Sequence, residues 1–374
     1  MLNELKLENF RNFSGASLSF QSRSVIFRGA NGQGKTSLLE SIFFIANLRS
    51  FRTSQTREIK KIGSQSFRLG VSIKRNEKWN TRLELEAGNI RSLKIDGLPV
   101  SKASDFTGRI KTIAFLPDDP FIINGSSQLR RRFFDMFICM LDREYFTALQ
   151  HYSSALKSRN FILKSRNLNR DILLSYNSLL ASSGEKIIKL RLKYSQLLSD
   201  GMKNILAEIR PELADFRIRM RYAKETEDRE SFMKKLEADF SRDVQKGFTT
   251  FGPHLDDFDF IVDEKSLRFY GSRGQCRMAS LCLKLAELEI VKMNSPSDND
   301  TVVLVDDATG DLDVKAKFSF LSKIAMAGQI FHAFTELPDD GFFRESQTIY
   351  QRFMVHILIP ALRQIFQVEN GTVS

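Results

Sequence analysis

Short apolar runs and helical periodicities alternate along the chain. Residues 2–10 alternate apolar and polar side chains, which predicts a half-buried strand that returns at residues 16–20. Residues 25–27 form a continuous apolar run that predicts a buried strand, and residues 38–48 are apolar on most helical faces and predict a buried helix. Residues 301–305 have the β-branched composition of a central parallel strand.

The middle of the chain changes texture. Four short runs after the first helix predict strands at residues 67–73, 81–87, 92–95 and 111–116. Together they predict a β-rich subdomain without helices. Residues 128–210 then carry apolar side chains at helical spacing, with breaks expected at residues 167–169 and 182–184. Strands are expected again at residues 216–223 and 258–262. The apolar tail, residues 342–366, is expected to pack on the core, with a helix around residues 350–366.

Strand–helix alternation on both sides of the helical stretch predicts an α/β fold in two parts. A discontinuous domain, with a mixed sheet and the β-rich subdomain, is expected from residues 1–120 and 211–374. A compact all-helical insert, lobe II, is expected at residues 121–210.

The turn between the first buried strand and the first helix has the chemistry of a phosphate-binding loop. Gly29, Gly34, Lys35 and Thr36 fit G-x-x-x-x-G-K-[ST]. Glycines let backbone N–H groups approach phosphate oxygens, and the helix N-terminus adds about half a positive charge. The expected ATP-binding residues are Gly29, Ala30, Asn31, Gly32, Gln33, Gly34, Lys35, Thr36 and Ser37. The alternative is a glycine turn followed by a surface lysine.

Two carboxylates end the β-branched run. In a phosphate-loop protein this strand is expected beside the first one, so that Asp306 reaches Mg²⁺ together with the Thr36 hydroxyl. Asp307 is then placed to polarise the attacking water, and Lys35 to neutralise the β- and γ-phosphates. The alternative is that both aspartates begin a surface turn.

A second anion site is predicted about 30 residues before these aspartates. It comprises Ser272, Arg273, Gly274 and Gln275 at the start of a helix that is expected to run to about residue 291. This order is found in ATP-binding-cassette (ABC) proteins, which carry a dimer-contact loop where Asp311 and Asp313 follow here. A simple helix N-cap is the alternative for Ser272.

Composition and charge point to a polyanionic partner. The 374 residues are 42% hydrophobic and 27% charged, with a net charge of +11. Three cysteines form no paired framework, and neither a signal peptide nor a run of about eighteen apolar residues is present, so a cytoplasmic protein without a membrane partner is expected. Without a helix-turn-helix, zinc or base-stacking motif, a nucleic-acid partner would be recognised by its backbone and not by its sequence.

The excess of basic residues is concentrated in two stretches, residues 49–82 and 126–170. For each cation the alternative is a solvated or internally paired side chain. The candidates for binding a nucleic acid are Arg49, Arg52, Arg57, Lys60 and Lys61 after the first helix, and Arg130, Arg131, Arg132, Lys157, Arg159, Lys164 and Arg166 in the insert.

Taken together, these motifs resemble the RecF family of bacterial DNA replication and repair ATPases, related to SMC and Rad50 heads. The resemblance spans nearly the whole chain. It is carried by the phosphate loop and by residues 9–12, 49–53, 130–135, 155–160, 247–250, 252–254, 272–275 and 369–371.

The resemblance implies an ABC-type ATPase head that binds ATP and Mg²⁺ through Lys35, Thr36 and Asp306, with Asp307 where most such ATPases have Glu. It implies that Ser272 and Gly274 contact the γ-phosphate held by a second subunit, so that ATP closes a homodimer. Such a dimer clamps duplex DNA near single-strand gaps, helps RecO and RecR place RecA after DNA damage, and hydrolyses ATP slowly under DNA stimulation.

Four positions depart from the family pattern: Pro120, Leu255, Gly310 and Ala333. They motivate an alternative in which ATP gates dimerisation and DNA binding on a scaffold that no longer hydrolyses it. A transporter's cytosolic ATPase is a third hypothesis, weakened by the absence of membrane segments and by the order of the motifs.

Overall fold

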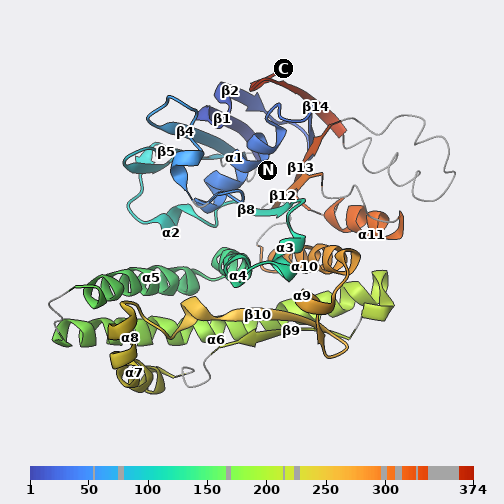
Figure 1. The fold of residues 1–374 in the computed structure, drawn as a ribbon. Coiled ribbons are helices and arrows are strands. Elements are labelled where there is room, and N and C mark those ends of the chain that lie inside the picture. Colours follow the sequence, from blue (N-terminus) through green and yellow to red (C-terminus); the bar gives the residue numbers. More distant parts are fainter. Residues whose placement is uncertain are drawn as a thin grey trace. The chain divides into compact units, whose positions relative to one another are not determined.

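The computed structural model describes residues 1–53, 55–74, 80–165, 170–213, 215–222, 228–295, 301–307, 314–325, 327–335 and 362–374. The chain divides into two compact units (Figure 1). The first comprises Met1–Asp119 and Glu287–Ser374, and the second comprises Pro120–Ala286. The predicted phosphate loop belongs to the first unit, and the predicted second anion site belongs to the second.

An antiparallel sheet of six strands forms one layer of the first unit, in the order β2-β1-β4-β5-β6-β7. Its strands alternate buried apolar and exposed polar side chains, as expected for a sheet with one face on the core. They are β1 (Leu2–Phe10), β2 (Phe13–Ser19), β4 (Phe67–Lys74), β5 (Asn80–Ala87), β6 (Arg91–Ile95) and β7 (Leu98–Pro99).

A second six-stranded sheet carries the phosphate loop, in the order β15-β14-β3-β13-β12-β8. Its strands run parallel except for β15, and β3, β12 and β13 are buried on both faces. They are β3 (Ser24–Arg28), β8 (Lys111–Phe115), β12 (Thr301–Asp306), β13 (Gln329–Phe334), β14 (Leu362–Glu369) and β15 (Thr372–Val373).

Helix α1 (Lys35–Asn47) packs against both sheets, which explains why it is apolar nearly all round. Phe44 contacts Phe10 of β1 and Phe67 of β4, while Asn47 donates to Thr112 of β8. The first unit also contains α2 (Ala103–Phe106), the 3₁₀ turn η1 (Thr56–Glu58) and α11 (Val314–Ala325).

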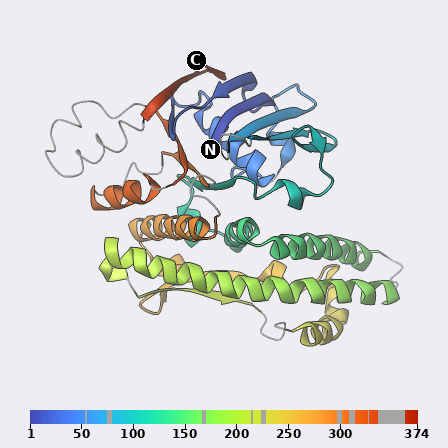
Figure 2. The ribbon, with the colours of Figure 1, turned by 180° about the vertical axis from the view of Figure 1, so that it is seen from behind.

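Helices dominate the second unit, and side-chain caps fix where several of them begin. Ser126, Asp142 and Asp228 each accept a backbone N–H in the first turn of α4, α5 and α7. Figure 2 shows α5 alongside α6. The helices are α3 (Pro120–Asn124), α4 (Ser127–Leu141), α5 (Arg143–Leu163), α6 (Arg170–Ile209), α7 (Arg229–Ala238), α8 (Phe240–Lys246), α9 (Leu267–Tyr270) and α10 (Arg273–Met293), with 3₁₀ turns η2 (Pro211–Leu213) and η4 (Pro253–Leu255).

The second unit extends beyond the predicted helical insert. The described elements within residues 121–210 are all helices, but the unit continues to Ala286 and includes a three-stranded antiparallel sheet, β11-β10-β9. Its strands are β9 (Phe216–Arg221), β10 (Asp257–Val262) and β11 (Lys265–Ser266). Because β9 packs on α6 and β10 packs on α4, residues after 210 stay with the helices, and the boundary falls inside α10.

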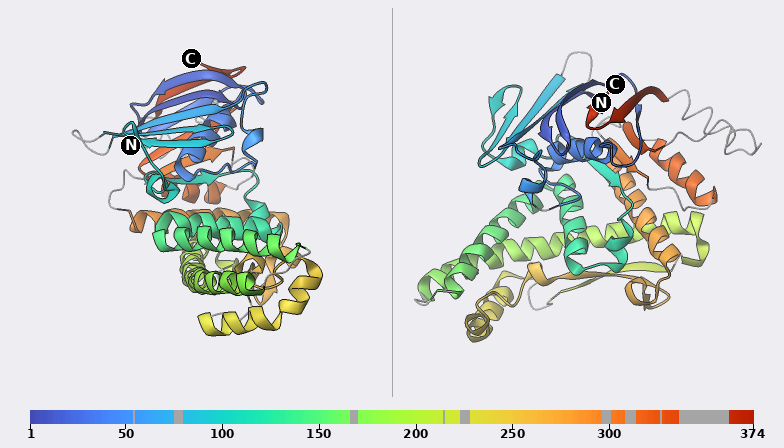
Figure 3. Two further views of the ribbon diagram at one scale, coloured as in Figure 1. Left: turned by 90° about the vertical axis from the view of Figure 1, so that its left-hand side faces the viewer. Right: turned by 45° about the horizontal axis from the view of Figure 1, so that its top comes forward.

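Two local predictions are wrong. Residues 182–184 do not break a helix, because α6 continues through them for 40 residues (Figure 3). Residues 362–366 are not helical but lie in β14, which pairs with β3. The predicted break at residues 167–169 lies outside the described residues.

Candidate functional site

The phosphate loop follows β3 and ends where α1 begins. Gly32 and Gly34 have φ angles of +82° and +120°, a region that favours glycine. A Cβ atom on Gly34 would also lie 2.7 Å from Asn12 Nδ2 and 2.9 Å from the Phe13 ring. A Cβ atom on Gly29 would collide with the Val368 carbonyl oxygen. Different neighbours therefore require a glycine at the first and at the last glycine position of the loop.

Lys35, the first residue of α1, folds back over the loop. Its Nζ donates to the carbonyl oxygens of Gly29 at 2.5 Å and Ala30 at 2.8 Å, and the side chain is buried. Burial lowers the pKa of Lys35, and the carboxylates of Asp306 and Asp307 oppose that shift. The loop thus holds a cation within the electrostatic reach of two carboxylates.

Asp306 ends β12 and is hydrogen-bonded to the Thr36 hydroxyl. Burial raises the pKa of Asp306, against the hydrogen bond from Thr36. The strand is not beside β3 as expected, since β13 lies between them, and Ala333 pairs in register with both Asp306 and Phe27.

The oxygen donors at this point suit Mg²⁺. This ion prefers oxygen ligands, and the protein usually supplies only one or two of them, while substrate phosphates and water supply the others. Thr36 and Asp306 supply one hydroxyl and one carboxylate. Across the described parts of the chain, no group of three His, Cys, Asp or Glu side chains could hold a metal ion by itself. Asp307 is exposed and has a φ of +45°.

A buried carboxylate anchors α1 from the other side, and sequence reasoning missed it. Glu40 is inaccessible to solvent and accepts from Arg11 Nε at 2.8 Å and Arg11 Nη2 at 2.6 Å. Its Oε1 also accepts from the Ser50 hydroxyl, and Arg52 lies 3.8 Å away. The signal was a single Glu within an apolar helix, because such a charge must be paired when it is buried.

The hairpin of β14 and β15 also contacts the phosphate loop, and sequence reasoning gave it no role there. Asn370 N donates to Gln33 Oε1 at 2.5 Å, and Gly371 N donates to the Gln33 carbonyl at 3.2 Å. The Thr335 hydroxyl, just after β13, donates to Asn31 Oδ1 at 3.0 Å. Segments far from the loop in sequence therefore hold it in place.

The predicted second anion site lies at the start of α10. Ser272 and Gln275 form a reciprocal capping box, with Ser272 N donating to Gln275 Oε1 at 2.8 Å and Gln275 N donating to Ser272 Oγ at 3.2 Å. Residues 272–275 are all exposed. A Cβ on Gly274 would meet only Ser272 Oγ, at 4.0 Å, so packing within the chain does not require a glycine there.

The structure removes two arginines from the predicted DNA surface. Arg130 is buried, with Nε 2.7 Å from Asp257, and Arg159 is buried, with Nη1 2.7 Å from Asp243. A side chain without solvent exposure cannot reach a phosphate while these pairs hold, so the DNA-binding prediction is wrong for both. Arg131 is half-buried and donates to the Asp256 carbonyl at 2.6 Å.

A third buried arginine, which the sequence did not single out, joins the helices of the second unit. Arg191 of α6 contacts Asp135 at 2.7 Å and Asp256 at 2.9 Å. It also donates to the Pro253 carbonyl at 2.7 Å, which fixes the turn that carries His254. Burial raises the pKa of Asp256 to about 6, although Arg191 opposes that shift.

His254 is held by the fold rather than left free in that turn. The Tyr152 hydroxyl lies 2.8 Å from His254 Nδ1, and the Thr249 carbonyl lies 3.0 Å from Nε2. Burial lowers the pKa of His254.

The remaining basic candidates differ in exposure. Five of them are exposed: Arg49, Arg52, Arg57, Lys157 and Lys164. Arg132 is half-buried. Lys60 donates to the Gln65 carbonyl at 3.1 Å, and Lys61 donates to the Ser14 hydroxyl. Arg166 and the predicted dimer-loop residues Asp311 and Asp313 lie outside the described residues.

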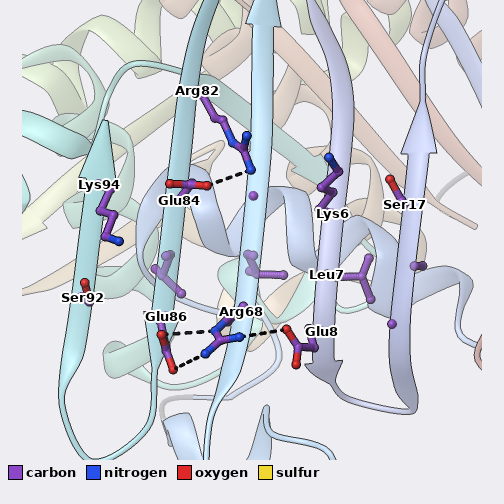
Figure 4. Close-up of a pocket in the computed structure, with 15 residues that line it drawn as sticks. Lys6, Leu7, Glu8, Ser17, Arg68, Arg82, Glu84, Glu86, Ser92 and Lys94 are labelled. Carbon is purple, nitrogen blue, oxygen red and sulfur yellow. Dashed lines mark hydrogen bonds and ion pairs between the residues drawn. The ribbon is translucent and has the colours of Figure 1, made fainter. Parts of the chain in front are cut away.

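The outer face of the antiparallel sheet forms a hollow of about 670 Å³ (Figure 4). Arg68 lies between Glu8 and Glu86, at 3.3 Å and 3.2 Å, and Arg82 pairs with Glu84 at 2.8 Å. Because these basic side chains are paired with acids, they add little to a cationic surface.

None of the described helices has the length and apolarity needed to span a membrane.

The chain is similar to a known family and to named relatives. Residues 1–356 match the family described as RecF/RecN/SMC N terminal domain. A DNA replication and repair protein RecF from Ruminiclostridium cellulolyticum is 35% identical over 325 residues, covering 84% of this chain and 87% of that protein. A protein of the same name from Streptococcus thermophilus is 33% identical, covering 100% of this chain and 98% of its own length.

The fold is also similar to solved structures. A structure described as the recombination mediator protein RecF-ATP in the RecFOR pathway is 28% identical, with a TM-score of 0.84, and covers 100% of this chain and 96% of its own. An Smc head domain from Pyrococcus furiosus is 13% identical, with a TM-score of 0.50 over 100% of this chain and 95% of its own, which speaks to the fold alone. The predicted fold class, an α/β ABC-type ATPase head, is confirmed.

Proposed function

The chain belongs to the RecF family, and on this premise we propose that it is an ATP-dependent DNA-binding protein of replication and recombinational repair. The observation that carries the proposal is the convergence of Lys35, Thr36 and Asp306 at the phosphate loop. In this role the loop, residues 29–37, binds ATP, and Lys35 leaves its carbonyl partners to neutralise the β- and γ-phosphates.

Thr36 and Asp306 would hold Mg²⁺, which neutralises charge on the phosphate oxygens when it is bound. Asp307 follows directly after Asp306 and offers an exposed carboxylate that could orient a water for hydrolysis.

ATP would also join two copies of the chain. Ser272, Arg273, Gly274 and Gln275 are exposed, and Ser272 and Gln275 are hydrogen-bonded to each other at the start of α10. The N-terminus of a long helix favours an anion. We propose that Ser272 and Gly274 contact the γ-phosphate of ATP held by a second copy, with Asp311 and Asp313 in the adjoining dimer loop.

The dimer would clamp duplex and gapped DNA through the phosphate backbone. Exposed cations from both units, Arg49, Arg57 and Lys157 among them, support this role. Gapped DNA, RecR and RecO are the proposed partners, because the solved RecF–ATP structure is described within the RecFOR pathway. Assistance to RecA loading and an involvement in the SOS response follow from this assignment.

ATP binding by the purified protein tests the proposal. Lys35→Ala removes the cation at the loop and is expected to weaken ATP affinity, measured by calorimetry with Mg²⁺, roughly 10- to 100-fold. Lys60→Ala removes a lysine that bonds the Gln65 carbonyl and is expected to leave ATP affinity unchanged. Equal affinities for the wild type and Lys35→Ala would reject the assignment of the loop.

A second candidate function is a scaffold that binds ATP without turnover. The departures at Gly310 and Ala333 favour it. Single-turnover hydrolysis with gapped duplex DNA separates the two functions. If the protein is an ATPase, Asp307→Asn slows hydrolysis and retains ATP binding; if it is a scaffold, the wild type and Asp307→Asn give the same rate.

A further inference from the structure

We propose that the hairpin of β14 and β15 is part of the ATP site, where Asn370 and Gly371 act as positioning residues for the phosphate loop. This inference rests on the proposed ATP binding and goes beyond it, because it assigns a nucleotide-binding role to residues more than 330 positions away from the loop. The segment contacts the loop and would not touch the phosphates.

The contacts converge on one loop residue. Gln33 lies between Gly32 and Gly34, and its carbonyl oxygen accepts from Asn12 Nδ2 at 2.9 Å and from Gly371 N at 3.2 Å. Its side-chain Oε1 accepts from Asn370 N at 2.5 Å. Both acceptors of Gln33 are therefore held on the side of the hairpin and of the β1–β2 turn.

This arrangement fixes the orientation of a peptide plane. In a trans peptide the C=O of one residue and the N–H of the next point in opposite directions. Because two donors hold the Gln33 carbonyl toward the hairpin, the Gly34 N–H is directed away from it. Backbone N–H groups of such a loop are the donors that a phosphate needs, and they must be oriented before the ligand arrives.

The turn of the hairpin is shaped to fit the loop. Asn370 and Gly371 have φ angles of +48° and +75°, as in a two-residue type I′ turn. A Cβ on Gly371 would lie 2.5 Å from the Asn12 carbonyl oxygen and 3.3 Å from Asn12 Nδ2. Asn12 is the other donor to the Gln33 carbonyl, so a side chain at position 371 would disturb both supports at once.

The hairpin is firmly attached to the strand that leads into the loop. β14 pairs in parallel with β3, and Val368 is buried. A Cβ on Gly29 would collide with the Val368 carbonyl oxygen, so the hairpin also contacts the first residue of the loop. The first residue of the loop and Gln33 are thus both supported by β14 and the residues that follow it.

The chain offers a matched control for a test. Asp96 and Gly97 form a similar turn between β6 and β7, with φ angles of +51° and +80°, and a Cβ on Gly97 would meet nothing within 4 Å. Gly371→Ala and Gly97→Ala impose the same backbone strain, but only Gly371→Ala disturbs a support of the phosphate loop. ATP affinity with Mg²⁺ is measured by calorimetry and the unfolding temperature by circular dichroism, both on the full chain.

We expect Gly371→Ala to weaken ATP affinity roughly three- to tenfold, the effect of about one lost hydrogen bond, while Gly97→Ala stays within about twofold of the wild type. Equal ATP affinities for the two variants would overturn the inference and leave the proposed function standing. A wild-type protein that does not bind ATP would overturn both.

Gln33→Ala provides a second test that leaves the hairpin turn unchanged. It removes the acceptor for Asn370 N and is expected to weaken ATP affinity by a similar, severalfold factor. Gln33→Ala and Gly371→Ala act on neighbouring hydrogen bonds between the hairpin and Gln33. Because both loosen the same support of the loop, the loss in the double variant should be smaller than the product of the two single losses. A product of independent losses, or an unchanged affinity in Gln33→Ala, would contradict the proposed role.

Discussion

At the scale of single residues, the distribution of charge along the sequence does not show which charges reach the surface. Arg130, Arg159 and Arg191 are among the largest buried side chains, and each is paired with an Asp from another segment. Their partners, Asp257, Asp243 and Asp135, lie up to 127 positions away. A count of basic residues in one stretch therefore overstates the surface that DNA could contact.

Two neighbours on α5 should separate structural from binding roles. Arg159→Met leaves Asp243 buried without its cation and is expected to lower the free energy of unfolding by about 3–5 kcal/mol. Lys157→Ala, at an exposed position, should change the free energy of unfolding by less than about 0.5 kcal/mol. Urea denaturation measures both effects.

If Lys157 contacts a phosphate, Lys157→Ala should reduce the slope of log affinity against log salt by about 0.9 for duplex DNA. An unchanged slope would remove Lys157 from the DNA surface.

The buried cluster around Arg191 predicts a pH dependence of stability. The pKa of Asp256 is about 6 in the folded chain, above its ordinary value of 3.8, because burial outweighs the attraction of Arg191 and Arg131 and nearby Asp135 adds repulsion. Between these two values the folded state binds the extra proton, so stability from this group is present at low pH and is lost as pH rises through 6.

Relative to Asp256→Asn, the wild type should therefore lose roughly 1 kcal/mol in its free energy of unfolding between pH 5 and pH 7. Denaturation of both proteins at the two pH values measures the difference. A difference that does not vary with pH would show that the pKa of Asp256 is not raised.

At the scale of elements, predictions from local pattern succeeded where the signal is contiguous. The β3–loop–α1 segment could be identified because its glycines, lysine and threonine follow one another, and the alternating strands of the antiparallel sheet show their buried face in the sequence. Pairing between distant strands leaves no such local pattern. This is why β13 between β3 and β12, and β14 beside β3, were not foreseen.

Residues 182–184 show how a local signal can mislead. Ser, Ser and Gly usually interrupt helices, but Gly184 lies where α6 meets Phe232 of α7, and a Cβ there would be 2.7 Å from the ring Cζ. The small residues allow close packing and do not end the helix. Local pattern also fails to predict the role of Glu40, because its partners Arg11 and Ser50 lie outside the helix that carries it.

Gly184→Ala tests this explanation. Overpacking against Phe232 should destabilise the protein by about 1–3 kcal/mol, despite a gain in helix propensity of about 1 kcal/mol. Ser182→Ala, at an exposed position two residues earlier in α6, should be neutral or slightly stabilising. Thermal unfolding of the two variants measures the contrast, and a stabilised Gly184→Ala would show that Phe232 does not restrict this position.

At the scale of the whole molecule, the two predicted halves of the nucleotide site belong to different units. The phosphate loop, with Lys35 and Thr36, lies in the first unit, and Ser272–Gln275 begin α10 in the second. Each segment is ordered by its own contacts, the loop by Asn12 and the β14–β15 hairpin, and the start of α10 by its capping box. In the proposed dimer, ATP brings the loop of one copy to α10 of another.

Light scattering of the purified protein with ADP, with ATP and with ATP plus duplex DNA measures whether this dimer forms. We expect a monomer with ADP and a dimer with ATP and Mg²⁺, stabilised further by DNA. Lys35→Ala should dimerise less than the wild type because its ATP affinity is lower. Gly274→Ala should bind ATP yet dimerise weakly, since its added methyl group lies at the exposed start of α10. A wild-type protein that binds ATP and stays monomeric under all three conditions would show that ATP does not join two copies.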